Sequence, residues 1–276
     1  MAGTSYMKKA LLVAFKCLVA LLYISPFYIV LIYAVKSKPE LAQDRLGFPT
    51  TIHWENFVNG VKQSNFFNAL WNSLLSTVIS VVVLTLICSM AAYIIARRKN
   101  KLYSILYYLM LGAMLIPFQA IMTPLYKDLK AWGLIDTILG FSLAKIGFEV
   151  AYTTILITGF VKSIPVDLEE AAVIDGTSPW GTFWKIVFPL MKPIVCTSAI
   201  LNTLSVWNDF QVSVVILQKM EKYTLSLTQY FFFGKNVVEL GMAFAVFLLS
   251  MIPIIALYLA LQRYIISGIT SGAVKG

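Results

Sequence analysis

The sequence is poor in charged residues, cysteine and histidine. Charged residues make up 13% of its 276 positions and hydrophobic residues 59%, whereas soluble domains carry about 25% charged residues. This balance argues against a water-soluble enzyme and against a disordered chain. Cys17, Cys88 and Cys196 each lie in an apolar run without CxxC spacing, which is typical of small core residues. The single histidine, His53, lies in a polar stretch, which argues against a histidine-based metal site and against Ser-His chemistry. We expect no catalytic, cofactor-binding or metal site.

The positive charge excess has two possible explanations. The formal net charge of +9 could indicate nucleic-acid binding. In so apolar a chain, basic loops at an anionic membrane surface explain it better. We therefore expect membrane lipid, and no nucleic acid, as a partner.

Six apolar stretches are long enough to cross a bilayer, since about 20 helical residues span its core. They cover residues 17–35, 70–96, 102–125, 138–160, 193–217 and 241–262. The first resembles a signal peptide, but it is too long and lacks a clear cleavage site, so we predict a retained helix. The sequence thus predicts an all-α polytopic membrane protein with six transmembrane helices.

Basic residues in the short loops predict the orientation. The connection between the second and third stretches contains Arg97, Arg98, Lys99 and Lys101. This connection is expected to be cytoplasmic. Both termini and residues 161–192 then fall on the same side, with His53 and Trp132 outside.

The cytoplasmic segment 161–192 contains signals for a short helix. Asp167, with Glu170 three residues later, resembles a capping box. Gly176 can supply the left-handed conformation that ends a helix. Between them, small or apolar residues share one face at i, i+3, i+4 spacing: Leu168, Ala171 and Ala172.

A second helix is predicted directly after this turn. Ser178 can cap it, with Pro179 at its first position, and it runs to Pro189. Its aromatic residues are expected at the membrane surface: Trp180, Phe183 and Trp184. The small alanines of the first helix would let another surface approach closely. A short rigid helix of this kind can transmit a displacement imposed by a partner. An ordinary amphipathic loop helix would show the same local signals.

The spacing of residues in this segment resembles a known signature. Glu170-Ala171-Ala172 is followed after three residues by Gly176, after nine more by Ile186, and then by Phe188-Pro189. This pattern resembles the EAA loop of ABC importer permeases, written EAA-x3-G-x9-I-x-LP. Phe188 stands where the pattern has Leu, a change between two large apolar residues.

Two further stretches are similar to sugar-type permeases. Residues 207–210, Trp-Asn-Asp-Phe, look like the WND segment of this class, and residues 268–276 look like the tail of the second permease of a pair. The resemblance covers nearly the whole chain, and the maltose-type, multiple-sugar class is the most similar group. It implies a MetI-like permease core in helices two to six.

The resemblance also implies partners and an organisation of the chain. The implied partners are a sister permease, two copies of an ATP-binding subunit, an extracellular solute-binding protein and a sugar, in a bacterial or archaeal cell membrane. Residues 1–66 would form an N-terminal helix and external loop, 67–267 the permease domain with its coupling loop at 161–192, and 268–276 the tail. The implied ATPase-coupling residues are Glu170, Ala171, Ala172, Asp175, Gly176, Ile186 and Pro189, with Ala172 facing the ATPase. The implied tail contacts are Gly272, Lys275 and Gly276.

Ionisable residues inside predicted spans are functional candidates, because burying a charge in a membrane is costly. Lys145 and Glu149 in the fourth span and Asp209 in the fifth lie at comparable depth. Lys145 could neutralise Glu149 four residues away, pair with Asp209 across helices, or line a sugar pathway. Asn208 could contact sugar hydroxyls or a neighbouring helix. In maltose-type importers the sugar contacts lie mostly in the sister subunit.

Two other functions agree less well with the sequence. A secondary transporter driven by an ion gradient would typically show internal repeats, and none is convincing here. An intramembrane enzyme lacks a candidate motif. There is no Walker A sequence and no loop large enough for a domain, so if the protein takes part in active transport, we expect the ATPase to be another chain. Oligosaccharides are the favoured substrate class, although similar permeases also carry monosaccharides, sugar acids and glycerol phosphates.

Overall fold

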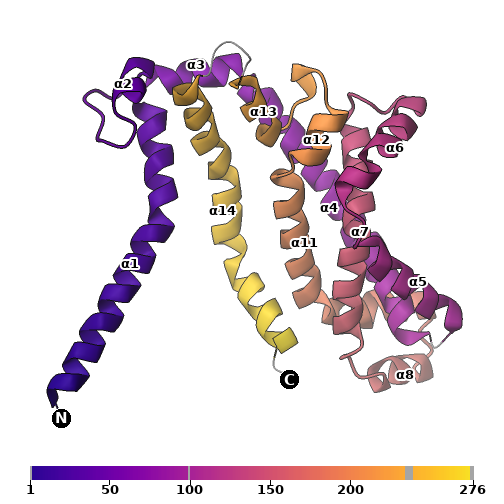
Figure 1. Ribbon diagram of the computed structural model, residues 1–276. Helices are drawn as coiled ribbons and strands as arrows, with labels where there is room; N and C mark the ends of the chain where they lie inside the picture. The colour runs from indigo at the N-terminus through magenta and orange to yellow at the C-terminus, as the bar shows by residue number, and fades with distance from the viewer. Residues whose placement is uncertain (1, 99, 234–238, 274–276) are drawn as a thin grey trace. The chain divides into compact units, whose positions relative to one another are not determined.

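The computed structural model describes residues 2–98, 100–233 and 239–273, and its secondary structure there is almost entirely helical (Figure 1). Among the described residues, four helices are long and apolar enough to cross a membrane, or up to six if each of two bent helix pairs is one span. The prediction of an all-α polytopic chain is confirmed. The number of spans lies between these limits. The chain divides into two compact units, residues 1–66 with 229–252 and residues 67–228 with 253–276.

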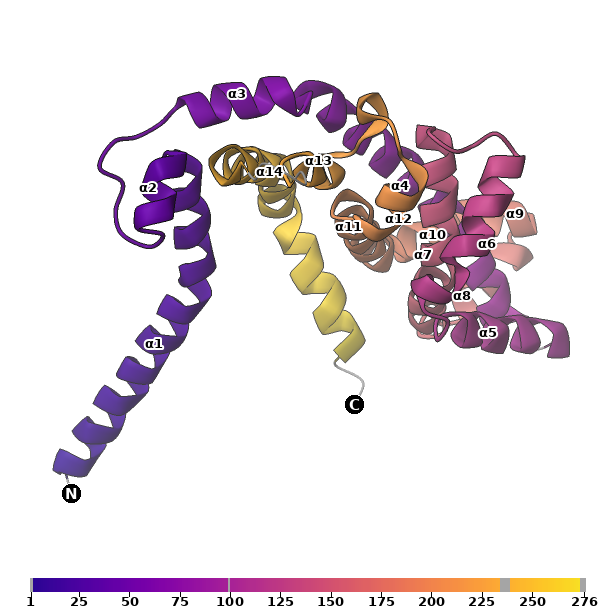
Figure 2. The ribbon, with the colours of Figure 1, turned by 45° about the horizontal axis from the view of Figure 1, so that its top comes forward.

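The first unit is built on three helices and the beginning of a fourth. They are α1 (Ala2–Val35), α2 (Lys38–Gln43), α3 (Glu55–Gln63) and the part of α14 (Leu240–Ala273) that precedes Pro253. Glycines bring α3 and α14 close together (Figure 2). A Cβ on Gly60 would lie 2.9 Å from Val246 Cγ2, and one on Gly241 would lie 2.8 Å from Asn56 Nδ2. Only a residue without a side chain allows this approach.

Side chains close the end of α1, where helix carbonyls have no partner within the helix. Asn56 Nδ2 donates to the carbonyls of Ala34 at 3.0 Å and Lys36 at 2.9 Å. The buried Lys36 ammonium donates to the Asp44 carbonyl at 2.9 Å. The carboxylate of Asp44 accepts from the amides of Leu46 and Gly47. These bonds fix the connection between α1 and α3.

The second unit contains the long helices α4 (Phe66–Arg97), α7 (Ile138–Val161) and α11 (Lys192–Trp207). One apolar core joins them to the segment that precedes α11: Leu84, Cys88, Ala92, Ile157, Val161, Ile164, Phe183, Val187, Met191 and Ile194. Small polar residues of α4 are buried as well, among them Ser76, Ser80 and Ser89. Small side chains of this kind let membrane helices approach closely.

The third predicted span is not one helix, which corrects the expectation for residues 102–125. Helix α5 (Lys101–Ala113) and helix α6 (Phe118–Ala131) meet at an angle of 104°. Pro117 lies at the break, with φ −69° and ψ 144° just before α6. Proline has no N–H to donate and disfavours helical geometry in the residue before it, which explains why α5 ends here.

The fifth predicted span is also interrupted, which corrects the expectation for residues 193–217. Helix α11 ends at Trp207, and a short α12 (Gln211–Ile216) follows Asn208, Asp209 and Phe210. Asp209 Oδ1 accepts the backbone amides of Val212 and Ser213, both at 3.0 Å. A carboxylate in this position caps a helix N-terminus. Asp209 therefore lies in the break before α12 and not within a continuous helix.

The remaining elements are short. They are α8 (Asp167–Ile174), α9 (Pro179–Thr182), the π-helix η1 (Phe183–Val187), α10 (Phe188–Leu190), the 3-10 helix η2 (Met220–Lys222) and α13 (Leu225–Phe231). The run from α9 to α10 meets α11 at an angle of 74°.

Candidate functional site

The segment between α7 and α11 forms two helices joined by a tight turn, as its sequence predicts. Gly176 has φ +82°, in the left-handed region, and Ser178 Oγ accepts the Gly181 amide at 3.2 Å. The second helix continues through η1 to Leu190. The predicted capping box is wrong, because Val166 precedes α8 and no side chain caps it.

Glu169 anchors α8 to the end of α4. Its carboxylate accepts from Arg97 Nε at 2.7 Å and from Tyr93 Oη at 2.9 Å. The Arg97 Nη2 group also donates to the Ile164 carbonyl at 2.9 Å. The Arg97 and Glu169 side chains are only 14% and 10% exposed. Charge-assisted bonds between such poorly exposed groups are among the stronger ones in proteins.

The sequence did not predict this anchor. Two adjacent glutamates, Glu169 and Glu170, precede the alanines, and the signature drew attention to Glu170. The structure buries Glu169 and exposes Glu170. Consecutive helical residues point about 100° apart, so only one of the two could face Arg97. The basic cluster at Arg97 was the available signal, although it was interpreted only as a sign of orientation.

Most of the other residues of α8 are exposed. Ala171 is exposed, and Ile174 is 85% exposed. Ala172 is only 7% exposed, since it lies one turn after Glu169 on the same face. The chain itself therefore covers most of Ala172 and leaves Ala171 exposed, and contact of either alanine with an ATPase stays a prediction. Of the other coupling candidates, Asp175 and Pro189 are exposed and Ile186 is partly buried.

The intramembrane charges meet in one cluster. Lys145 Nζ lies 3.2 Å from Glu149 Oε1 and 3.2 Å from Asp209 Oδ2. It also donates to Ser205 Oγ at 3.1 Å, and Ser205 in turn donates to Glu149. The Lys145 side chain is 6% exposed. Both pairings left open by the sequence are thus present, and one ammonium serves two carboxylates.

The four residues proposed for a pathway differ in exposure. Lys145 is buried, and Glu149 and Asp209 have side chains that are 17% and 10% exposed. Asn208 is exposed where α11 ends. No group of three or more His, Cys, Asp or Glu side chains that could hold a metal ion occurs in the described part of the chain.

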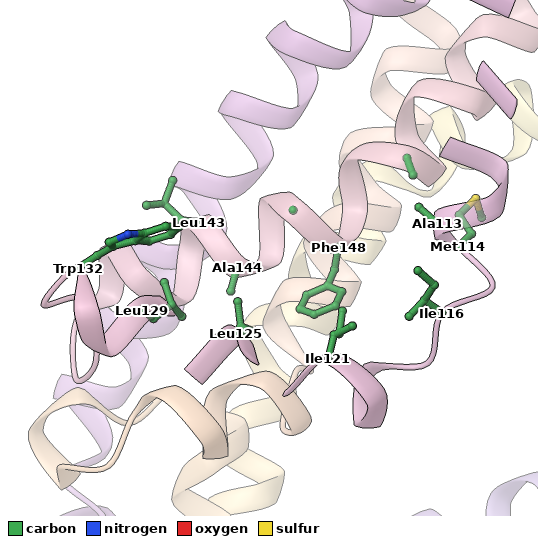
Figure 3. A pocket seen from close by; sticks show the side chains of 12 residues that line it. Ala113, Met114, Ile116, Ile121, Leu125, Leu129, Trp132, Leu143, Ala144 and Phe148 are labelled. Carbon is green, nitrogen blue, oxygen red and sulfur yellow. The ribbon is translucent and has the colours of Figure 1, made fainter. Parts of the chain in front are cut away.

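A cavity of about 350 Å³ lies between the bent pair α5–α6 and helix α7 (Figure 3). Its lining is almost wholly apolar: Ala113, Met114, Ile116, Ile121, Leu125, Leu129, Trp132, Leu143, Ala144, Gly147, Phe148 and Ala151. Sugar hydroxyls require hydrogen-bonding partners, since burying them without one is costly. This cavity is therefore suited to hydrocarbon and not to a sugar.

The predicted tail contacts lie at the C-terminal end of the chain. Gly272 falls within α14, which ends at Ala273. Lys275 and Gly276 lie outside the described residues. Their contact with an ATPase stays a prediction.

Comparison with known proteins agrees with the coupling-loop signature. Residues 86–271 match the family described as binding-protein-dependent transport system inner membrane component. The melibiose/raffinose/stachyose import permease protein MelC of Bacillus subtilis is 36% identical over 94% of each chain. The multiple sugar-binding transport system permease protein MsmG of Streptococcus mutans is 34% identical, over 92% of this chain and 93% of that protein.

A solved structure shares the fold. A bacterial ABC transporter involved in the import of the acidic polysaccharide alginate superposes with a TM-score of 0.82 at 23% identity, covering 95% of this chain and 97% of the other. The family match covers both the loop around α8 and the Lys145 cluster. The chain belongs to the family of inner membrane components of binding-protein-dependent transport systems, and is a multi-pass ABC transporter permease.

Proposed function

We propose that this chain is one of two permease subunits in an ATP-driven sugar importer, and that α8 couples it to a cytoplasmic ATP-binding subunit. The exposed side of α8 carries this proposal. Glu170, Ala171 and Ile174 are exposed on a helix that Glu169 fixes to α4. A helix held on one side and free on the other is suited to dock into a partner's cleft.

The contacts that anchor α8 would transmit its displacement to the spanning helices. A displacement of α8 by the ATPase would act on α4 through the Glu169–Arg97 ion pair. It would also act on α11, because the segment from α9 to Leu190 leads directly into that helix. Phe183 and Val187 of this segment pack in the same core as Leu84 and Ile157. Close-packed cores transmit such strain because they have low compressibility.

The orientation follows from the same assignment. Coupling requires α8 to be cytoplasmic, and the adjacent basic residues Arg97 and Arg98 support this side. Both termini would then be cytoplasmic and the connection between α1 and α3 extracellular. The membrane would be the cell membrane of a bacterium or archaeon.

The substrate is proposed to be an oligosaccharide. MelC is named for melibiose, raffinose and stachyose, and MsmG for multiple sugars. An extracellular solute-binding protein would deliver the sugar to a pathway shared with the sister permease. Asn208, exposed at the break after α11, is better placed to touch a passing sugar than the buried Lys145.

Sugar uptake tests this proposal. A strain that lacks the gene should lose uptake of one or more oligosaccharides from a panel of raffinose, stachyose, melibiose and maltodextrins, and the restored gene should recover it. The purified complex should hydrolyse ATP faster when sugar-loaded binding protein is added. Unchanged uptake of every sugar, or uptake that continues without ATP while an ion gradient persists, would contradict the proposal.

A further inference from the structure

A second cavity, of about 270 Å³, lies where α4 ends and α9 begins. One wall is apolar or aromatic, and two arginines lie at its end. The lining residues are Met90, Tyr93, Ile94, Arg97, Arg98, Pro179, Trp180 and Phe183. We call this cavity the arginine groove.

The two arginines of the groove differ in their partners. Arg97 is bound to Glu169 and to the Ile164 carbonyl. Arg98 is exposed, and no hydrogen bond or carboxylate partner for its side chain is found in residues 2–98, 100–233 and 239–273. Of the charges at the groove, only that of Arg97 is neutralised. An anion could therefore bind at Arg98 without displacing an existing contact.

The apolar wall continues along α4, away from Arg98. Positions 87, 94 and 98 lie within about 40° of one another on a helix of 3.6 residues per turn. Ile87 and Ile94 are 51% and 41% exposed. Trp180 is 61% exposed and borders the groove. Its ring packs edge-on against the ring of Trp184, with the two ring centroids 5.8 Å apart. Tryptophan is enriched where membranes meet water.

We propose that the arginine groove binds one anionic phospholipid of the cytoplasmic leaflet. Its phosphate would lie against Arg98, and an acyl chain would follow Ile94 and Ile87. This inference rests on the proposed orientation. A soluble anion would gain nothing from the apolar wall, and a soluble ATPase would not follow a stripe that runs into a spanning helix. A lipid uses both features.

Native mass spectrometry of the purified transporter complex tests the site. The complex is equilibrated with equal amounts of phosphatidylglycerol and phosphatidylcholine, and the tightly retained lipids are counted. Arg98→Ala should lower phosphatidylglycerol retention by about fivefold, since one basic residue near an anionic surface contributes about 1 kcal/mol. Ile94→Trp should fill the groove and abolish retention of the same lipid.

Lys192→Ala is the matched control. Lys192 is an exposed cation at the start of α11 and does not line the groove, so its removal should leave retention unchanged. Equal losses in Arg98→Ala and Lys192→Ala would overturn the site. So would displacement of the lipid by millimolar glycerol phosphate, which would indicate a free-anion site, or loss of the ATPase from Arg98→Ala with lipid retention unchanged. Because lipid counting requires no transport, failure here leaves the uptake test unaffected.

Discussion

At the scale of single residues, Lys145 is a buried cation whose stability depends on its partners. It forms ion pairs with two carboxylates, Glu149 in α7 and Asp209 in the break before α12. Removing one member of a buried ionic group leaves an uncompensated charge, which costs about 3–5 kcal/mol. The two ion pairs of Lys145 therefore connect α7 to the segment that precedes α12.

Lys145→Met should destabilise the purified transporter by about 3–5 kcal/mol. A triple variant that adds Glu149→Gln and Asp209→Asn should recover much of this loss, because it removes both stranded charges while Asn keeps an oxygen to cap α12. Lys127→Met, at an exposed position, serves as the control. Thermal unfolding measures all three variants. A triple variant no more stable than Lys145→Met would contradict the neutralising role.

The two adjacent glutamates of α8 should have different roles, Glu169 in stability and Glu170 in association with the ATPase. Glu169→Gln should destabilise the loop by about 1.5–3 kcal/mol, since it weakens hydrogen bonds between charged groups. Glu170→Gln should leave stability unchanged and weaken ATPase association, because Glu170 is exposed and no bond from its side chain occurs in the described part of the chain. Limited proteolysis and co-purification measure the two effects. The reverse assignment of effects would refute the anchor at Glu169.

At the scale of elements, Gly176 ends α8 and sets the direction of the next helix. Gly176→Ala should cost about 1–2 kcal/mol, since its φ of +82° is left-handed. Gly159→Ala is the control, because Gly159 lies inside α7 with open space around its Cβ position. That change should be neutral or stabilise the helix by up to about 1 kcal/mol. Chemical denaturation compares the variants, and equal stabilities would contradict the strained turn.

The connection between α1 and α3 should loosen in acid. The amides of Gly47 and Leu46 hold the pKa of Asp44 below its ordinary value of 3.8. A depressed pKa contributes stability that is fully present above the ordinary value and is lost as the pH falls through the lower, folded value. Protection of these amides from hydrogen exchange, corrected for intrinsic rates, should therefore persist above pH 3.8 and fall as the pH drops below that value. Asp44→Ala should remove this dependence, and unchanged protection in the native protein would contradict it.

The sequence predicted continuous elements better than broken ones. The spans in α1, α4, α7 and α14 follow from long apolar runs, because an apolar helix satisfies its own backbone hydrogen bonds and can cross a bilayer. The breaks at Pro117 and Asp209 lie inside equally apolar windows, so mean hydropathy does not distinguish a broken helix from a continuous one there. The turn at Gly176 was predictable because its conformation is local. The partners of Glu169 and Lys145 were not, since they depend on which faces of separate helices meet.

At the scale of the whole molecule, the proposed function makes the chain one subunit of a larger transporter. It has no phosphate-cradling sequence, so the purified chain alone should neither bind nor hydrolyse ATP. Equilibrium dialysis with labelled ATP checks this, with the assembled transporter as the positive control. Stoichiometric binding by the isolated chain would contradict the division of labour between permease and ATPase.

The exposed side of α8 is proposed to dock the ATP-binding subunit. Co-purification of that subunit with Ala171→Trp tests it most directly, because Ala171 is exposed and small. A bulky side chain in a close contact costs about 1–3 kcal/mol, so retention of the ATPase should fall about tenfold while membrane insertion stays normal. Lys185→Trp, at an exposed position outside α8, should retain it. Full retention and normal uptake with Ala171→Trp would show that α8 is not the coupling element.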